Sequence, residues 1–324
     1  MRKSISGLVA LSMSALVIAA STVGAQAQVD IGSAGSGEIA AGSVDPDSGS
    51  AQAGIASSGS AGSLGSSGSA GSSGSSTESA GSAGVAAGHS SVVAFGDSFT
   101  SNSNHFANLG YGSPLVQAIY PSNAGCLYSP NSWPMLLARD TGRPVQNWAC
   151  NGHTTEDMLR RIEHAGSTGA LDNATTVILA AGMNDTWRTI PDAEIVDNLV
   201  AAVDKVRGVA PEAKILLLGR LSSTDDREMF CSLNVIPNVP MGIHSPGFAA
   251  NERRNQANQR DAAVRADVEY LDIRDLTRSN STCAPDAQRF ISGNVDFTTH
   301  QYNMTGHPSL AGSTFLAQQV GAHL

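Results

Sequence analysis

Two residues far apart in the chain have side chains suited to acyl transfer. Ser98 ends a Gly-Asp-Ser turn that follows an apolar, β-branched run, and His307 stands before a proline near the C-terminus. A serine hydroxyl can attack a carbonyl carbon, and a histidine can accept the proton and return it to the leaving group. Each residue also fits a purely structural role, since Asp and Ser favour turns and His307 precedes an expected helix.

Two further residues supply hydrogen-bond donors of the kind that such a reaction needs. Gly152 and Asn184 each follow an expected strand, as Ser98 does. The carboxyl ends of parallel strands meet at one edge of a sheet, so these three turns should converge. The backbone N–H groups of Ser98 and Gly152, with the Asn184 amide, could bind an oxyanion. Asn184 would otherwise cap a turn.

The elements that position these residues alternate along the chain. Short apolar runs predict strands, and helical spacing of apolar residues predicts helices between them. We expect strands at 91–95, 145–149, 176–181, 214–218 and 268–273, and helices at 131–139, 156–164, 192–208, 248–266 and 309–320. This alternation predicts an α/β fold with a parallel sheet between two helical layers. The polar helix 248–266 should lie on the outside, and segment 221–246 should form an irregular rim or lid over the strand ends.

In order and placement, these motifs resemble the four blocks of the SGNH (GDSL) hydrolase family. They are Gly96-Asp97-Ser98-Phe99, Gly152, Gly182-Met183-Asn184-Asp185 and His307, and the resemblance covers residues 90–315. It implies a flavodoxin-like three-layer α/β/α sandwich with a parallel central sheet. It also implies ester hydrolysis through an acyl-enzyme intermediate, with Ser98 as nucleophile and His307 as general base, and with no metal or cofactor.

One position departs from the family pattern. Where the family usually has an aspartate that orients the catalytic histidine, three residues before it, this chain has Met304. A thioether cannot hold the imidazole N–H as a carboxylate does. We therefore expect the main-chain carbonyl of Met304 to orient His307, and the alternative candidate is Asp296.

Composition limits the partners and the compartment. The chain has 324 residues and a net charge of −9, which argues against nucleic acid as a partner. Residues 1–27 have a basic start, an apolar run and a small-x-small site, which predicts a secretory signal peptide. Residues 28–88 are rich in Gly, Ser and Ala and should form a flexible linker. Residues 89–324 should be the folded domain.

Four cysteines in an exported chain suggest two disulfides. We favour pairing Cys126 with Cys150 and Cys231 with Cys283, because each pair lies in one half of the domain. The sequence has no close Cys-x-x-Cys pair of the kind that binds zinc, so a metal site is the less favoured interpretation of the cysteines.

Other polar and aromatic residues near the motifs are assigned provisional roles. We expect Asp97 and Asp185 to shape turns by accepting backbone hydrogen bonds. His153 and His300 could line the pocket or cap a loop. Trp187 follows the third motif and is the tryptophan best placed to touch substrate.

These observations predict a secreted serine esterase or lipase, monomeric and free of any transmembrane span. Its substrate would be a small-molecule, lipid or acylated-glycan ester, and the protein could associate with the cell envelope. Two alternatives stay open. One is a non-catalytic surface protein that binds through the same fold, and the other is an acyltransferase to a sugar or glycolipid acceptor.

Overall fold

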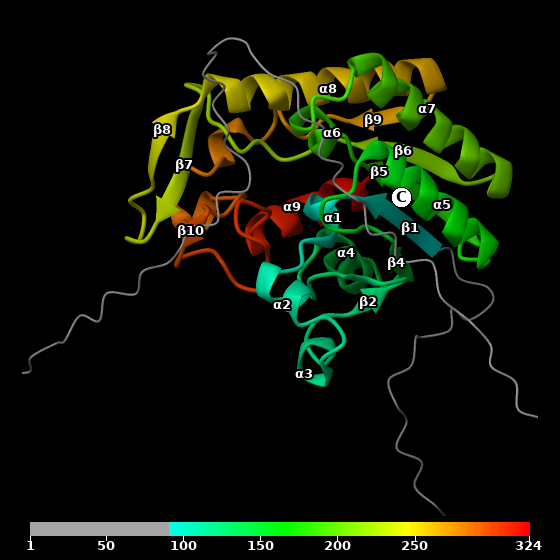
Figure 1. Ribbon diagram of the computed structural model, residues 1–324, viewed down its shortest axis with the longest axis horizontal. Coiled ribbons are helices and arrows are strands. Elements are labelled where there is room, and N and C mark those ends of the chain that lie inside the picture. Colours follow the sequence, from blue (N-terminus) through cyan, green and yellow to red (C-terminus); the bar gives the residue numbers. More distant parts are fainter. Residues whose placement is uncertain (1–90) are drawn as a thin grey trace, which may run out of the picture. The chain divides into compact units, whose positions relative to one another are not determined.

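Five parallel strands form the centre of the domain in the computed structural model, which describes residues 91–324 (Figure 1). They are β1 (Ser91–Gly96), β4 (Val145–Asn147), β5 (Ala174–Ala180), β6 (Lys214–Leu218) and β9 (Glu269–Leu271). Their order in the sheet is β4-β1-β5-β6-β9. This is the flavodoxin-like order, in which the direction of winding reverses beside β1. The predicted parallel sheet is therefore confirmed.

Two layers of helices enclose this sheet because its strands are apolar on both faces. One layer is α5 (Thr155–Ser167), α7 (Asp192–Val209) and α8 (Pro246–Ala266), and the other is α4 (Trp133–Thr141) and α9 (Leu310–Gly321). Helices α5, α7 and α8 share one hydrophobic core with the sheet, and α4 and α9 share the other. Alternate residues of β1 serve the two layers: Val93 and Phe95 pack in the first core, and Val92 and Ala94 in the second. The three-layer sandwich is thus confirmed.

The remaining elements are short and lie mainly in the loops. They are α1 (Ser98–Ser101), α2 (His105–Leu109), α3 (Pro114–Gln117), α6 (Met183–Trp187), η1 (Arg278–Asn280), η2 (Asp286–Gln288), β2 (Ser122–Asn123), β3 (Cys126–Leu127), β7 (Met229–Asn234), β8 (Met241–His244) and β10 (Val295–Asp296).

The prediction of an irregular segment at 221–246 was wrong. This segment contains the antiparallel pair β7–β8, and β10 adds a third strand beside β7. Pro237, Asn238 and Pro240 lie between the two strands, and Asn238 has a positive φ of 58°. They make the turn of a hairpin, which is where such residues are favoured.

Helix α8 was predicted to lie on the outside with its polar residues exposed, but many of these polar residues are buried. Glu252 accepts hydrogen bonds from the backbone N–H groups of Ser223 and Thr224, and Gln259 donates to the carbonyl of Ala181 at 2.9 Å. These side chains satisfy backbone groups where the strands end, which allows a polar helix face to be buried. Amphipathic periodicity cannot reveal a buried face of this kind.

Both predicted disulfides are present. Cys126–Cys150 joins β3 to the loop after β4, and Cys231–Cys283 joins β7 to the loop before η2. Within residues 91–324, none of the helices has the length and apolar character needed to cross a membrane. The predicted signal peptide and linker lie outside the described residues.

Candidate active site

Ser98 stands at the start of α1, directly after β1. The Asp97 carboxylate caps this helix, accepting the backbone N–H of Phe99 at 2.8 Å. Gly96 makes the turn possible, because a Cβ there would lie 2.6 Å from the carbonyl oxygen of Ala180. Ser98 itself is 7% exposed, so its hydroxyl is largely shielded from water.

His307 approaches the serine from the loop before α9. Its Nε2 lies 2.7 Å from Ser98 Oγ, and its Nδ1 lies 2.8 Å from the carbonyl oxygen of Thr305. This geometry fits a neutral imidazole whose Nδ1–H donates to the carbonyl while Nε2 accepts the serine hydroxyl. Burial lowers the pKa of His307 to about 3, so the ring is neutral at neutral pH and free to take a proton.

The predicted orienting groups need correction. The carbonyl that holds His307 belongs to Thr305, one residue after Met304, whose own carbonyl accepts from the Asn303 amide at 3.2 Å. Gly306 has a positive φ of 70°, and this turn brings the carbonyl two residues before the histidine to its ring. A main-chain carbonyl is therefore the partner, as expected, but from a different residue.

Asp296 does not orient His307 either. Its carboxylate accepts hydrogen bonds from the backbone N–H groups of Gly293, Thr298 and Thr299 and faces the Arg289 guanidinium. These bonds offset the cost of burial and lower the pKa of Asp296 to about 2. The residue shapes the loop that leads to the histidine.

Asn102 links the serine helix to the histidine loop and was not foreseen from the sequence. It adopts a left-handed conformation after α1. Its side chain accepts the N–H of Met304 at 3.1 Å and donates to the carbonyl of Pro308 at 2.8 Å. The two bonded backbone groups flank His307, so this one asparagine sets the distance between loop and helix. A single asparagine in a polar loop carries no recognisable signal.

The three predicted oxyanion donors come from turns after neighbouring strands. The backbone N–H groups of Ser98 and Gly152 donate to no protein atom among the described residues. Gly152 has a positive φ of 78°, and nothing lies within 4 Å of where its Cβ would stand. The Asn184 amide donates to the carbonyl of His153 at 2.8 Å, which leaves its second N–H for another acceptor.

Asp185 holds these turns in place. Its carboxylate accepts the Thr155 backbone N–H at 3.0 Å and the Thr155 hydroxyl at 2.6 Å, so it ties α6 to the start of α5. Asn151 makes a similar link, donating to the Ser103 carbonyl at 3.0 Å. Burial raises the pKa of Asp185, and it raises that of Asp97 to about 6. Both aspartates accept backbone hydrogen bonds, as predicted.

An arginine and a phenylalanine form a stack behind the histidine. The Arg220 guanidinium lies 3.8 Å from the centroid of the Phe99 ring, whose centroid is 4.9 Å from that of the His307 imidazole. The positive charge of Arg220 also lowers the pKa of His307. Arg220 follows β6 in a segment without any motif, so the sequence does not single it out.

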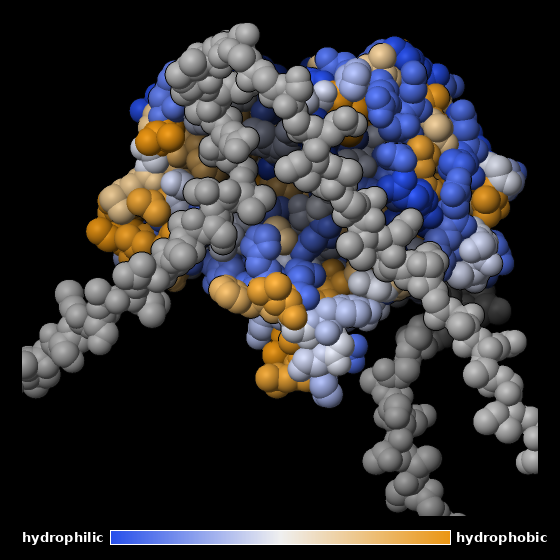
Figure 2. Space-filling view, in the orientation of Figure 1, coloured by the Kyte–Doolittle hydropathy of each residue, from blue (hydrophilic) through white to orange (hydrophobic). Residues whose placement is uncertain are grey.

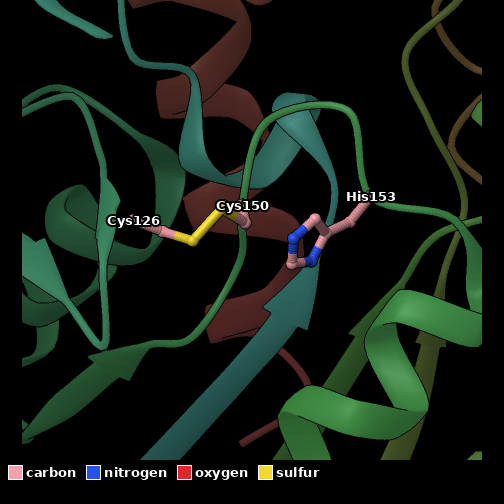
Figure 3. Close-up of side chains that lie close together, drawn as sticks. All are labelled: Cys126, Cys150 and His153. Carbon is pink, nitrogen blue, oxygen red and sulfur yellow. A yellow bond between two sulfur atoms is a disulfide. The ribbon is translucent and has the colours of Figure 1, made fainter. Parts of the chain in front are cut away.

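The cysteines nearest the site do not form a metal site. Cys126, Cys150 and His153 lie close together, and Figure 3 shows the imidazole of His153 beside the Cys126–Cys150 disulfide. Sulfurs joined in a disulfide are not the thiolates that bind zinc. The bond instead anchors the turn that carries Gly152.

The other two provisional residues lie in different surroundings. His300 Nε2 is 3.2 Å from the Asn104 amide, so it contacts the loop after α1. Trp187 is 44% exposed and lies edge-on against Phe248, which stacks on Phe230. These three rings form an aromatic row that begins on α6, the helix that also carries Asn184.

Comparisons with known proteins identify a family and similar solved structures. A sequence model of the GDSL-like lipase/acylhydrolase family matches residues 94–314. A search of curated proteins finds no match. Among solved structures, the chain is similar to phospholipase A1 from Streptomyces albidoflavus NA297, with 19% identity, coverage of 72% of this chain and 98% of that chain, and a TM-score of 0.49. It is also similar to an extracellular lipase from Streptomyces rimosus, with 17% identity, coverage of 72% and 98%, and a TM-score of 0.47.

Proposed function

Because the chain belongs to the GDSL-like lipase/acylhydrolase family, we propose that it is a secreted serine esterase or lipase. The observation that carries this proposal is the 2.7 Å contact between Ser98 Oγ and a neutral His307. A buried serine beside a neutral base is the arrangement that nucleophilic catalysis requires. The two disulfides support an oxidising compartment outside the cytoplasm.

In the proposed reaction, Ser98 Oγ attacks the ester carbonyl while its proton moves to His307 Nε2. The oxyanion that forms accepts hydrogen bonds from the N–H groups of Ser98 and Gly152 and from the Asn184 amide. His307 then protonates the departing alcohol, which leaves an acyl group on Ser98. Water loses a proton to His307 and attacks this acyl-enzyme, and His307 returns the proton to Ser98 Oγ as the acid leaves.

The Thr305 carbonyl takes the part that an aspartate has in a triad. It keeps the Nδ1–H in place and stabilises the imidazolium through the partial charge of its oxygen. With this partner present, Met304 no longer argues for a non-catalytic binding protein.

The substrate is proposed to be an acyl ester with a carbon chain longer than acetate. The row of Trp187, Phe248 and Phe230 offers an apolar surface that starts on α6, the helix that carries Asn184. An acyl chain lying along these rings would be removed from water, at a gain of about 0.8 kcal/mol for each buried methylene.

The experiment is hydrolysis of p-nitrophenyl esters from acetate to palmitate by the protein and its Ser98→Ala variant. We expect loss of turnover in Ser98→Ala and an optimum above acetate. Ser91→Ala is the matched control, since Ser91 is a buried serine at the opposite end of β1, bonded to the Asn173 carbonyl. Equal turnover by the wild type and Ser98→Ala would refute the proposal.

A further inference from the structure

Three segments near the active site lack fixed surface charge. Segments 98–138 and 229–251 contain no Asp, Glu, Lys or Arg, and segment 290–324 contains only Asp296, which is buried. Apart from histidines, no side chain in these segments carries an exposed charge near neutral pH. The whole chain has 19 basic and 28 acidic residues, so this absence is not a general property of its composition.

The same segments hold most of the exposed large apolar side chains of the described residues. All such side chains but four lie in them, the exceptions being Trp187, Val209, Val264 and Leu276. Within the three segments, the most exposed are Phe106 at 82%, Leu109 at 86%, Leu115 at 74%, Ile243 at 69% and Phe297 at 79%. Scattered apolar residues are ordinary on a surface, but a concentration in uncharged segments indicates an interaction site.

The three segments adjoin one another at the catalytic edge of the sheet. The first contains Ser98 and the third contains His307, and the second follows β6. The Tyr120 hydroxyl donates to the carbonyl of Tyr302 at 3.1 Å, which joins the first segment to the third. Strand pairing of β10 with β7 joins the third to the second. Figure 2 shows hydrophobic colour over the β7–β8 hairpin and over α2 and α3.

We propose that these segments form a docking face that seats the enzyme on an uncharged lipid surface, with Ser98 turned toward the lipid. The proposal rests on the proposed function, and it names aggregated lipid esters as the substrate class. Protruding Phe and Leu side chains on α2, on α3 and on the loop after β10 suit insertion among acyl chains. A protein partner is the less suitable occupant, because protein interfaces usually include arginine and a polar rim.

The test measures binding to vesicles of phosphatidylcholine in the Ser98→Ala background, so that turnover plays no part. The double variant Phe106→Ser, Phe297→Ser should bind about a hundredfold more weakly, at about tenfold for each apolar side chain kept from the lipid. Val264→Ser with Leu276→Ser is the matched control, since these residues are 81% and 62% exposed outside the face. This control should bind like the parent, and binding should not weaken with salt.

Several results would overturn the docking face. The first is that the parent does not bind the vesicles. The second is that the double variant binds as tightly as the parent, with an unchanged thermal unfolding midpoint. The third is that the control variant loses as much affinity as the double variant. A dimer of the parent that the double variant cannot form, without vesicle binding, would assign the face to a second copy of the chain. Vesicle binding without Ser98-dependent ester turnover would retain the face and refute only the proposed function.

Discussion

The substitution Asp296→Asn should reduce the stability of the loop that leads to His307 without changing the chemistry of the candidate active site. The Asp296 carboxylate is buried and accepts three backbone N–H groups, and its pKa falls from 3.8 to about 2. At 1.36 kcal/mol for each pKa unit, this shift corresponds to a folding free energy on the order of 2–3 kcal/mol at pH 7. We expect Asp296→Asn to lose about that amount.

The pH dependence of this loss has a definite sign. A carboxylate whose pKa is depressed in the folded state stabilises the protein above its unfolded pKa of 3.8, and this stabilisation is lost as the pH falls through about 2. At pH 3 the difference between wild type and variant should therefore be roughly half of that at pH 7.

The assay is thermal unfolding of both proteins at the two pH values, together with ester hydrolysis at a temperature where both are folded. At pH 7 the midpoint should fall by roughly 5–10 °C. Asp261→Asn is the control, since Asp261 is 50% exposed and paired only with Arg265, and it should change the unfolding free energy by less than about 0.5 kcal/mol.

Turnover by Asp296→Asn should stay within a few fold of the wild type because Asp296 does not contact His307. A folded variant that is as inactive as Ser98→Ala would refute this reasoning, and it would mean that Asp296 orients the histidine. An unchanged midpoint at pH 7 would refute the stability argument.

Two further predictions concern the site itself. The acid limb of kcat/KM should lie well below pH 6.5, because burial lowers the pKa of His307 to about 3, and Arg220→Gln should move this limb upward by removing a neighbouring positive charge. A limb near 6.5 in both proteins would contradict this assignment. Asn184→Ala should lower kcat by about 10²–10³-fold through loss of an oxyanion donor. An unaltered kcat would exclude Asn184 from the oxyanion hole.

Much of the fold could be predicted from the sequence because its signals are local. The run from Val92 to Phe95 and the run from Ile215 to Leu218 are buried strands whose apolar character is readable without tertiary information. Amphipathic spacing in α5 and α7 similarly indicates helices. The order of these elements limits the topology to a few choices, of which a parallel sheet with right-handed crossovers is the usual one.

The candidate site residues could also be predicted from the sequence, because they lie in motifs that follow expected strands. Ser98, Gly152 and Asn184 follow consecutive strands of the sheet, and the shared carboxyl edge of parallel strands accounts for their convergence. The role of His307 could be predicted only from the family pattern. The residues around it in the sequence do not indicate that a loop near the C-terminus lies beside the first strand.

Other features depend on contacts between distant segments and were decided only by the tertiary structure. The sequence by itself determined the strands of the central sheet, most of the long helices and the cysteine pairs, and it singled out Ser98 and His307 as the candidate nucleophile and base. Folding decided that the carbonyl of Thr305 holds His307, that Asn102 clamps its loop and that Arg220 stacks on Phe99. Every residue has a backbone carbonyl, so the sequence does not indicate which carbonyl contacts His307. The turn at Gly306, which has a positive φ, brings the Thr305 carbonyl to the imidazole.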